Sequence, residues 1–206
     1  MRFEEWEPHY REILDYFGFD RSADEEAAKV LSEILTSDDI GLLKDRICGK
    51  VVTVAGNAPT LSSELNRIEG VVIAADAAAL LLYKKGILPD AIFTDLDGAE
   101  DSFITMNEQG TIIVVHAHGD NIPLLRRWVP KFRGPIIGTT QSLPLPQIHN
   151  FGGFTDGDRA VFTAEALQAE RVILIGFDLS DPSVDPMKKG KLFWARKLLG
   201  MLGYDL

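Results

Sequence analysis

Two aspartates, Asp95 and Asp97, follow a short apolar run and stand two residues apart. If the preceding strand extends through them, both carboxylates face the same side of the sheet. Two adjacent carboxylates repel and raise each other's pKa unless a cation lies between them. Mg²⁺ suits such a pair, because it takes one or two carboxylates plus waters and substrate phosphates. We therefore predict a Mg²⁺ site, rather than a turn with capping aspartates, with Asp76 and Asp120 as further ligands.

The same four residues, Asp95-Leu96-Asp97-Gly98, also resemble the nucleophile motif of haloacid-dehalogenase-type phosphatases. That motif expects Thr or Val where this chain has Ala99, and it usually follows the first strand of the sheet. Here at least two predicted strands precede it. A phosphatase that uses Asp95 as its nucleophile is therefore the alternative function.

Two histidines follow a further apolar run, in the sequence His116-Ala117-His118-Gly119-Asp120. The spacing resembles the His-x-His-x-Asp motif of metallo-β-lactamase-type hydrolases, which continues with a histidine where this chain has Asn121. Only His149 remains downstream as a further histidine ligand. Histidines spaced by two on a strand can bind a transition metal, but they can also bind phosphate or a heterocycle. We predict that they are not a zinc site.

Two turns are candidates for phosphate binding. Gly56-Asn57-Ala58-Pro59-Thr60 is a strand-to-helix turn whose backbone could approach a phosphate at a helix N-terminus, although no Walker A or Gly-x-Gly-x-x-Gly pattern is present. In the Gly- and Asp-rich run 151–159, Thr155 or Asp156 can cap a helix. Arg159 opposes the helix dipole unless it meets an anion or a carboxylate. We predict that the loop from Asn150 to Arg159 and Lys191 close over the ligands, with Arg159 or Lys191 on phosphate oxygens.

The elements that position these residues alternate along the chain. Short apolar runs typical of strands buried on both faces occur at 51–55, 71–75, 91–94, 111–115, 135–137 and 171–175. Helical periodicity occurs at 59–68, 76–85, 120–129, 157–169 and 187–202. This alternation predicts an α/β fold, a mostly parallel open sheet flanked by helices. Ligands of such sheets bind beyond the carboxyl ends of the strands. Candidate nucleotide- or substrate-binding residues there are Gly56, Asn57, His116, His118, Asn121, Thr140, Gln141, Thr155, Asp156, Arg159, Asp178 and Lys191.

Residues 1–48 read as a helical N-terminal appendage, and residues 49–206 as the α/β catalytic domain. Trp6, Tyr10, Ile13, Leu14 and Phe17 form one amphipathic stripe that Gly18 ends, and Ser22 or Asp24 can cap a second helix. The proline-rich run 143–146 reads as an extended connection.

Composition restricts the partners. The 206 residues carry a net charge of −10, which disfavours nucleic acid and anionic membrane surfaces. No apolar stretch reaches the roughly 20 residues of a membrane span, the first residues lack a signal-peptide pattern, and the single cysteine forms no intrachain disulfide. We expect a cytoplasmic protein with small-molecule substrates, and the sequence leaves a homodimer open as its assembly.

The run Pro89-Asp90-Ala91-Ile92-Phe93-Thr94-Asp95-Leu96-Asp97, with Asp76 before it, resembles the metal-binding core of thiamin pyrophosphokinases, which usually carry Gly and Ser at the positions of Thr94 and Gly98. Together with the segments 56–60, 116–121, 138–141, 150–160, 176–178 and 191–195, it resembles the archaeal 6-hydroxymethyl-7,8-dihydropterin pyrophosphokinase family over nearly the whole chain. Ala58 departs from the Gly that relatives tend to carry.

This resemblance implies transfer of diphosphate from ATP to the hydroxymethyl group of a pterin, with release of AMP, in tetrahydromethanopterin or folate biosynthesis. It implies Mg²⁺ as cofactor and Asp95, Asp97 and Asp120 as catalytic residues, Asp120 either as a metal ligand or as the base. A thiamin-type acceptor, the phosphatase and a nucleotide-binding module without chemistry stay open as alternatives.

Overall fold

The computed structural model describes residues 1–205, which form alternating strands and helices. The strands are β1 (Val51–Ala55), β2 (Val71–Ala75), β3 (Ala91–Thr94), β4 (Ile112–Ala117), β5 (Ile136–Thr140), β6 (Ile148–His149) and β7 (Arg171–Ile175). The α-helices are α1 (Phe3–Phe17), α2 (Arg21–Ile34), α3 (Ile40–Ile47), α4 (Leu61–Glu64), α5 (Ala78–Lys84), α6 (Asp101–Glu108), α7 (Ile122–Trp128), α8 (Asp156–Ala166) and α9 (Pro186–Met201). Short 3₁₀ turns follow α4 (Leu65–Arg67) and α7 (Val129–Lys131).

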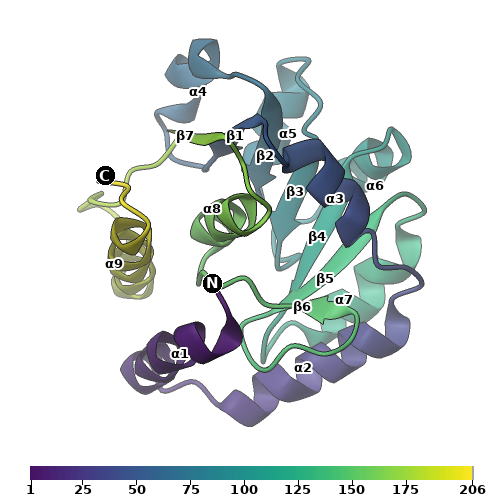
Figure 1. The fold of residues 1–206 in the computed structure, drawn as a ribbon, viewed down its shortest axis with the longest axis vertical. Coiled ribbons are helices and arrows are strands. Elements are labelled where there is room, and N and C mark those ends of the chain that lie inside the picture. Colours follow the sequence, from purple (N-terminus) through teal and green to yellow (C-terminus); the bar gives the residue numbers. More distant parts are fainter. Residues whose placement is uncertain (206) are drawn as a thin grey trace.

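Within these residues the strands form a seven-stranded parallel sheet of order β6-β5-β4-β3-β2-β1-β7 (Figure 1). Strands β1 to β6 follow one another toward one edge of the sheet. The chain then crosses back, and β7 pairs with β1 along Val51–Ala55 on the other side. This reversal opens a crevice beyond the carboxyl ends of β1 and β7, where ligands bind in sheets of this kind. The predicted α/β fold with an open parallel sheet is confirmed.

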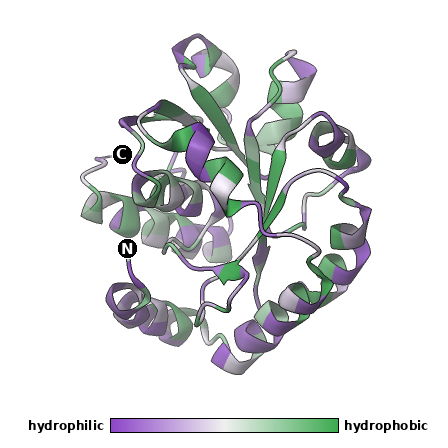
Figure 2. Ribbon diagram, turned by 45° about the vertical axis from the view of Figure 1, so that its right-hand side comes forward, coloured by the Kyte–Doolittle hydropathy of each residue, from purple (hydrophilic) through white to green (hydrophobic). Residues whose placement is uncertain are grey.

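Helices cover both faces of the sheet, and Figure 2 shows the apolar strands between them. One core joins α2, α5, α6 and α7 to the sheet through residues such as Leu31, Leu82, Phe103 and Leu125. The other core joins α3, α8 and α9 to the opposite face. Helix α8 lies against β1, β2 and β3, so its first turn sits at the carboxyl ends of the central strands.

The N-terminal helices are packed into these layers. Helix α1 places Trp6, Tyr10 and Ile13 against Phe162 of α8 and Trp194 of α9. Gly18 ends α1 in the left-handed conformation, as predicted. The predicted caps of α2 are wrong: Asp20 is the N-cap and accepts a hydrogen bond from the Ser22 backbone, while Asp24 lies buried inside the helix.

Three features differ from the sequence prediction. Helix α6 and strand β6 were not expected, because α6 lies in a polar stretch and β6 has only two residues. Strands β4 and β5 run on to Ala117 and Thr140, beyond their predicted ends. The run 143–146 is not simply extended, because it turns back so that Leu145 bridges Ile148. None of the helices in the described part of the chain combines the length and apolar character needed to span a bilayer.

Candidate active site

The sequence-predicted residues converge at the carboxyl edge of the sheet around a cavity of about 910 Å³. Fourteen of them line it: Gly56, Asn57, Asp76, Asp95, Asp97, His116, His118, Asp120, Gln141, Thr155, Asp156, Arg159, Asp178 and Lys191. Counting all the described residues of the wall, it holds nine aspartates, six of them among these fourteen, but only three cationic side chains, Arg159, Lys188 and Lys191. A polyphosphate entering this cavity therefore needs added positive charge.

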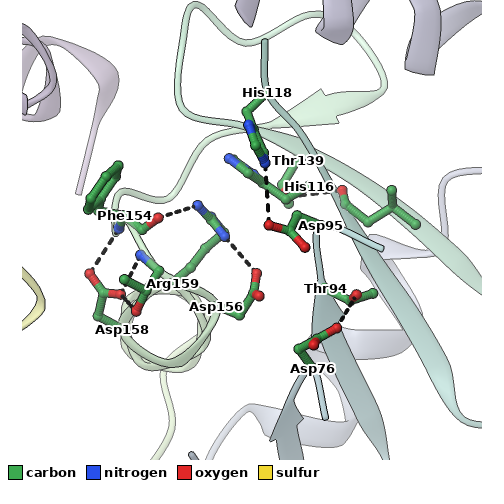
Figure 3. Close-up of polar contacts among 12 residues, drawn as sticks. Asp76, Thr94, Asp95, His116, His118, Thr139, Phe154, Asp156, Asp158 and Arg159 are labelled. Atoms are coloured by element: carbon green, nitrogen blue, oxygen red, sulfur yellow. Dashed lines mark hydrogen bonds and ion pairs between the residues drawn. The ribbon is translucent and has the colours of Figure 1, made fainter. Parts of the chain in front are cut away.

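Three carboxylates form the most compact group in the cavity. Asp76 follows β2, Asp95 follows β3, and Asp156 opens α8, and each offers an oxygen within 4.8 Å of the others. Figure 3 shows Asp95 and Asp156 facing each other with Asp76 below them. Sequence reasoning assigned Asp156 to ligand binding and not to the metal, because nothing in the sequence relates the start of α8 to the ends of β2 and β3.

Asp76 is held in an unusual conformation. Its φ of 44° lies in the left-handed region, its N–H donates to the Phe93 carbonyl, and its carboxylate accepts from the Thr94 hydroxyl at 2.6 Å. Burial and the neighbouring charge of Asp95 raise the pKa of Asp76 against the effect of the Thr94 hydrogen bond. A cation between the carboxylates removes this repulsion.

Asp95 and Asp97 come together by a different route from the predicted one. Strand β3 ends at Thr94, and the buried Leu96 turns the chain with a φ of 73°. The expectation that a continuing strand aligns the two carboxylates is therefore wrong, although both side chains reach the cavity. The Asp97 N–H donates to Asp95 Oδ1 at 3.1 Å.

The pKa values of Asp95 and Asp97 are shifted in opposite directions. Burial alone would raise the pKa of Asp95, but hydrogen bonds from His118 and the Asp97 backbone hold it below its ordinary value. Partial burial and the charge of Asp95 raise the pKa of Asp97 to about 6. Burial also raises the pKa of Asp156, with Asp95 and Asp76 adding to the effect and Arg159 opposing it.

The segment after β4 connects the histidines to this cluster. His118 Nε2 lies 3.3 Å from Asp95 Oδ2, and its Nδ1 lies 3.0 Å from Asp120 Oδ1. The Asp120 side chain is 89% exposed at the rim, outside the compact carboxylate group. Asn121 does not line the cavity; its amide instead donates to the Asp95 and His116 carbonyls and thereby fixes both strand ends.

The residues after β5 divide between the cavity wall and the structure behind it. Gln141 lines the cavity, whereas Thr140 lies behind the wall, where its hydroxyl accepts from the Ser142 N–H. Asp178 after β7 lines the cavity and accepts from the Ser180 N–H at 3.1 Å.

Sequence reasoning missed one buried carboxylate, Asp24. It accepts hydrogen bonds from the Tyr10 hydroxyl at 2.7 Å, the Gln141 amide at 2.8 Å and the Gly119 N–H at 2.8 Å. Asp24 therefore ties α1 and α2 to the loops that carry His118 and Gln141. A signal existed, because Asp24 occupies the apolar stripe of α2 three, four and seven residues before Ala27, Ala28 and Leu31.

The start of α8 holds the buried cation of the site. Thr155 caps the helix in a reciprocal pair with Asp158, which confirms one of the two predicted caps. Arg159 is 4% exposed and donates to Asp156 at 2.9 Å and to the Phe154 carbonyl at 2.8 Å. Asp156 is thus the carboxylate that offsets the charge of Arg159. The predicted contact of Arg159 with phosphate stays a prediction.

The turn after β1 approaches the end of β7 closely. A Cβ at Gly56 would lie 2.5 Å from the Gly176 carbonyl oxygen, so this position requires glycine. Lys188 and Lys191 of α9 also line the cavity, and their charges oppose the rise in the pKa of Asp76 and of Asp97, respectively. The arrangement thus combines oxygen ligands, glycine-rich turns and a few cations, as phosphoryl chemistry requires.

Comparison with known proteins identifies relatives of the whole chain. A family model described as 6-hydroxymethylpterin diphosphokinase MptE-like matches residues 25–183. A protein of Methanothermobacter thermautotrophicus named 6-hydroxymethyl-7,8-dihydropterin pyrophosphokinase is 43% identical, over 98% of this chain and 95% of that protein. Proteins of the same name from Methanocaldococcus jannaschii and Pyrococcus furiosus are 36% and 40% identical, over 98% and 87% of this chain and 96% and 79% of those proteins.

A solved structure has a similar fold. The MAf glycosyltransferase of Magnetospirillum magneticum AMB-1 superposes with a TM-score of 0.53 over 89% of this chain and 35% of that chain. The identity is 15%, so this likeness concerns the fold alone.

Proposed function

This chain belongs to the 6-hydroxymethylpterin diphosphokinase MptE-like family, and we propose that it transfers diphosphate from ATP to the hydroxymethyl group of 6-hydroxymethyl-7,8-dihydropterin and releases AMP. The observation that carries the proposal is the compact group of Asp76, Asp95 and Asp156 in a deep cavity at the carboxyl edge of the sheet. The archaeal relatives named for this activity align over nearly all of the chain.

The reaction requires one displacement at phosphorus. The hydroxymethyl oxygen bonds to the β-phosphorus of ATP, while the bond from that phosphorus to the oxygen bridging the α-phosphate breaks. AMP leaves with the bridging oxygen, and the hydroxyl proton is released. Such reactions depend mainly on positioning and on stabilisation of charge on the phosphoryl oxygens.

The donor set suits Mg²⁺. Three carboxylates with oxygens within 4.8 Å of one another offer the hard oxygen ligands that this ion prefers. Burial, with the charge of neighbouring carboxylates adding to it, raises the pKa of Asp76 and of Asp156. We assign Asp76, Asp95 and Asp156 as the residues that hold it, with Asp97 beside them. When bound, Mg²⁺ neutralises charge on the phosphate oxygens. Asp120, at the rim, is retained from the sequence prediction as a second candidate ligand or base.

The protein's own residues supply the remaining contacts. We assign the turn at Gly56 and Asn57 to the nucleotide phosphates, together with Thr155, Arg159 and Lys191. Arg159 and Lys191 are two of the three cationic side chains that line the cavity among the described residues, which supports assigning them to the phosphates. Asp178 and Gln141 complete the wall on either side.

We further propose that the product enters tetrahydromethanopterin or folate biosynthesis and that the protein acts in the cytoplasm. ATP is the co-substrate of the proposed reaction. The acidic surface agrees with small-molecule partners rather than nucleic acid or membrane.

The test is a screen of acceptor alcohols. The protein is incubated with ATP and Mg²⁺ and with 6-hydroxymethyl-7,8-dihydropterin, thiamin or no acceptor, and AMP and the diphosphorylated product are quantified. AMP formation that requires the pterin supports the proposal. AMP formation with thiamin alone, phosphate release from monoesters without ATP, or ATP binding without turnover would each replace it with one of the alternatives.

A further inference from the structure

His116 lies in the cavity wall, and one of its ring nitrogens has no hydrogen-bond partner among residues 1–205. The side chain is at the end of β4 and the residue is 2% exposed. Its Nδ1 lies 3.1 Å from Thr139 Oγ1 on β5, whereas its Nε2 is shielded from solvent and has no hydrogen-bond partner among the described residues. A buried polar atom without a partner is costly, so this nitrogen is a place where a ligand gains affinity.

The partner of Nδ1 determines the tautomer. Thr139 Oγ1 lies 3.1 Å from the Val115 carbonyl oxygen, which can only accept, and a Thr139 hydroxyl that donates there accepts a hydrogen bond from the imidazole. On this arrangement we assign the ring proton to Nδ1, which leaves a lone pair on Nε2. Burial, together with the positive charge of Arg159 and the nearby His118, lowers the pKa of His116 well below its ordinary value, so the ring is neutral.

A neutral ring of this tautomer can only accept at Nε2. Phosphate oxygens, which are also acceptors, are excluded as its partners. The partner must offer an O–H or N–H group. The adjacent His118 bonds to Asp95 of the carboxylate group, and Figure 3 shows the His116 ring between His118 and Arg159, above Asp95. The group that His116 meets therefore lies at the reacting end of the substrates.

We propose that His116 Nε2 accepts a hydrogen bond from the hydroxyl group of the acceptor alcohol and so orients the oxygen that is to be phosphorylated. This inference rests on the proposed function, since the acceptor is taken to be a hydroxymethylpterin. With the O–H directed at His116, the oxygen lone pairs remain free to face the phosphorus. His116 is thereby a binding residue for the acceptor rather than for ATP.

Two variants distinguish the roles of the two ring nitrogens of His116. His116→Asn keeps a donor near the position of Nδ1, which can still serve Thr139, and lacks the Nε2 acceptor. His116→Gln places a carbonyl oxygen near the position of Nε2. His149→Asn is the matched control, because His149 lies on β6 outside the cavity lining.

Affinities are measured by titration calorimetry for 6-hydroxymethyl-7,8-dihydropterin, for its 6-methyl analogue without the hydroxyl, and for ATP. We expect His116→Asn to lower the affinity for the hydroxymethyl ligand about tenfold, which is the scale of one hydrogen bond to a buried group. The affinities for the methyl analogue and for ATP should change less than about twofold. His116→Gln is expected to recover part of the loss, and His149→Asn to bind like the parent.

A ¹⁵N-histidine NMR spectrum of the parent protein tests the tautomer independently, since protonated and unprotonated ring nitrogens give distinct signals. An Nε2–H tautomer, equal losses for the two pterins, or no loss for either would overturn the inference. If the parent binds no pterin, the proposed function fails, and the same cycle with the alcohol that it does use and its deoxy analogue decides the role of His116.

Discussion

Gly98 provides a test of the carboxylate group that leaves each of the carboxylates itself unsubstituted. A Cβ at this position would lie 2.2 Å from Asp76 Oδ2 and 3.0 Å from its Cγ, whereas ordinary contacts are 3.4–4 Å. The Asp76 carboxylate must therefore move by more than about 1 Å in Gly98→Ala. Misplacement of this size in a catalytic group costs on the order of 100-fold in rate. We expect turnover to fall by about that factor, and saturation with Mg²⁺ to require a higher concentration.

The stability of Gly98→Ala should change little. Moving Asp76 weakens its hydrogen bond from Thr94, which is worth about 1 kcal/mol. Replacing glycine by alanine restores about 0.4–1 kcal/mol by restricting the unfolded chain. Gly200→Ala in α9, where the added Cβ meets nothing within 4 Å, is the control and should retain parental turnover. AMP formation and thermal unfolding are measured for both variants. Parental turnover in Gly98→Ala, with Mg²⁺ dependence unchanged, would refute the assignment of Asp76 to the metal site.

Asp95→Asn should abolish turnover with the thermal transition retained, and measurable turnover above a few per cent would contradict its role as a metal ligand. The pKa of Asp97 is raised to about 6 in the folded protein. Its contribution to folding stability is therefore present at low pH, where the carboxyl is protonated, and is lost as the pH rises through 6. In EDTA, Asp97→Asn should therefore gain stability relative to the parent at about pH 7.5 and not at about pH 4.5. Since Asp97 is exposed, the gain should be roughly 1 kcal/mol, by denaturant titration. Protein purified without added metal should contain no stoichiometric zinc; zinc that disappears in His116→Ala would revive the hydrolase alternative. Arg159→Lys should not restore the ATP affinity lost in Arg159→Ala, because lysine cannot replace the two fixed donors that now meet Asp156 and Phe154.

The sheet could be predicted because its strands are continuous apolar runs bounded by polar turns. The stretch Arg171–Ile175 shows this, since its ends in the structure match the predicted ones. The pattern does not determine strand order, and β6 lacks the length to give any apolar signal. Helix α6 escaped prediction because only Phe103, Met106 and Asn107 of its eight residues are buried.

The candidate site could be predicted as a set of strand ends but not as a geometry. Asp76 and Asp95 follow apolar strands that are neighbours in sequence as well as in the sheet, so their proximity follows from the alternation. Asp156 joins them only because α8 crosses back over β1, β2 and β3. That path depends on tertiary packing and leaves no mark in local sequence. Asp24 reaches the site by the same kind of packing, from a helix about 70 residues away in sequence from Asp95.

Leu96 shows how the fold sustains the turn that directs an acidic pair into the cavity. A branched side chain with a φ of 73° is strained by roughly 1–3 kcal/mol. Leu96 is fully buried in the core between the sheet and its helices, and burial of a leucine side chain contributes about 1.5–3 kcal/mol to stability. The Leu96 N–H is also satisfied, by the Thr94 hydroxyl at 2.8 Å. The apolar residue between the aspartates thus anchors the turn, and the turn directs both carboxylates into the cavity.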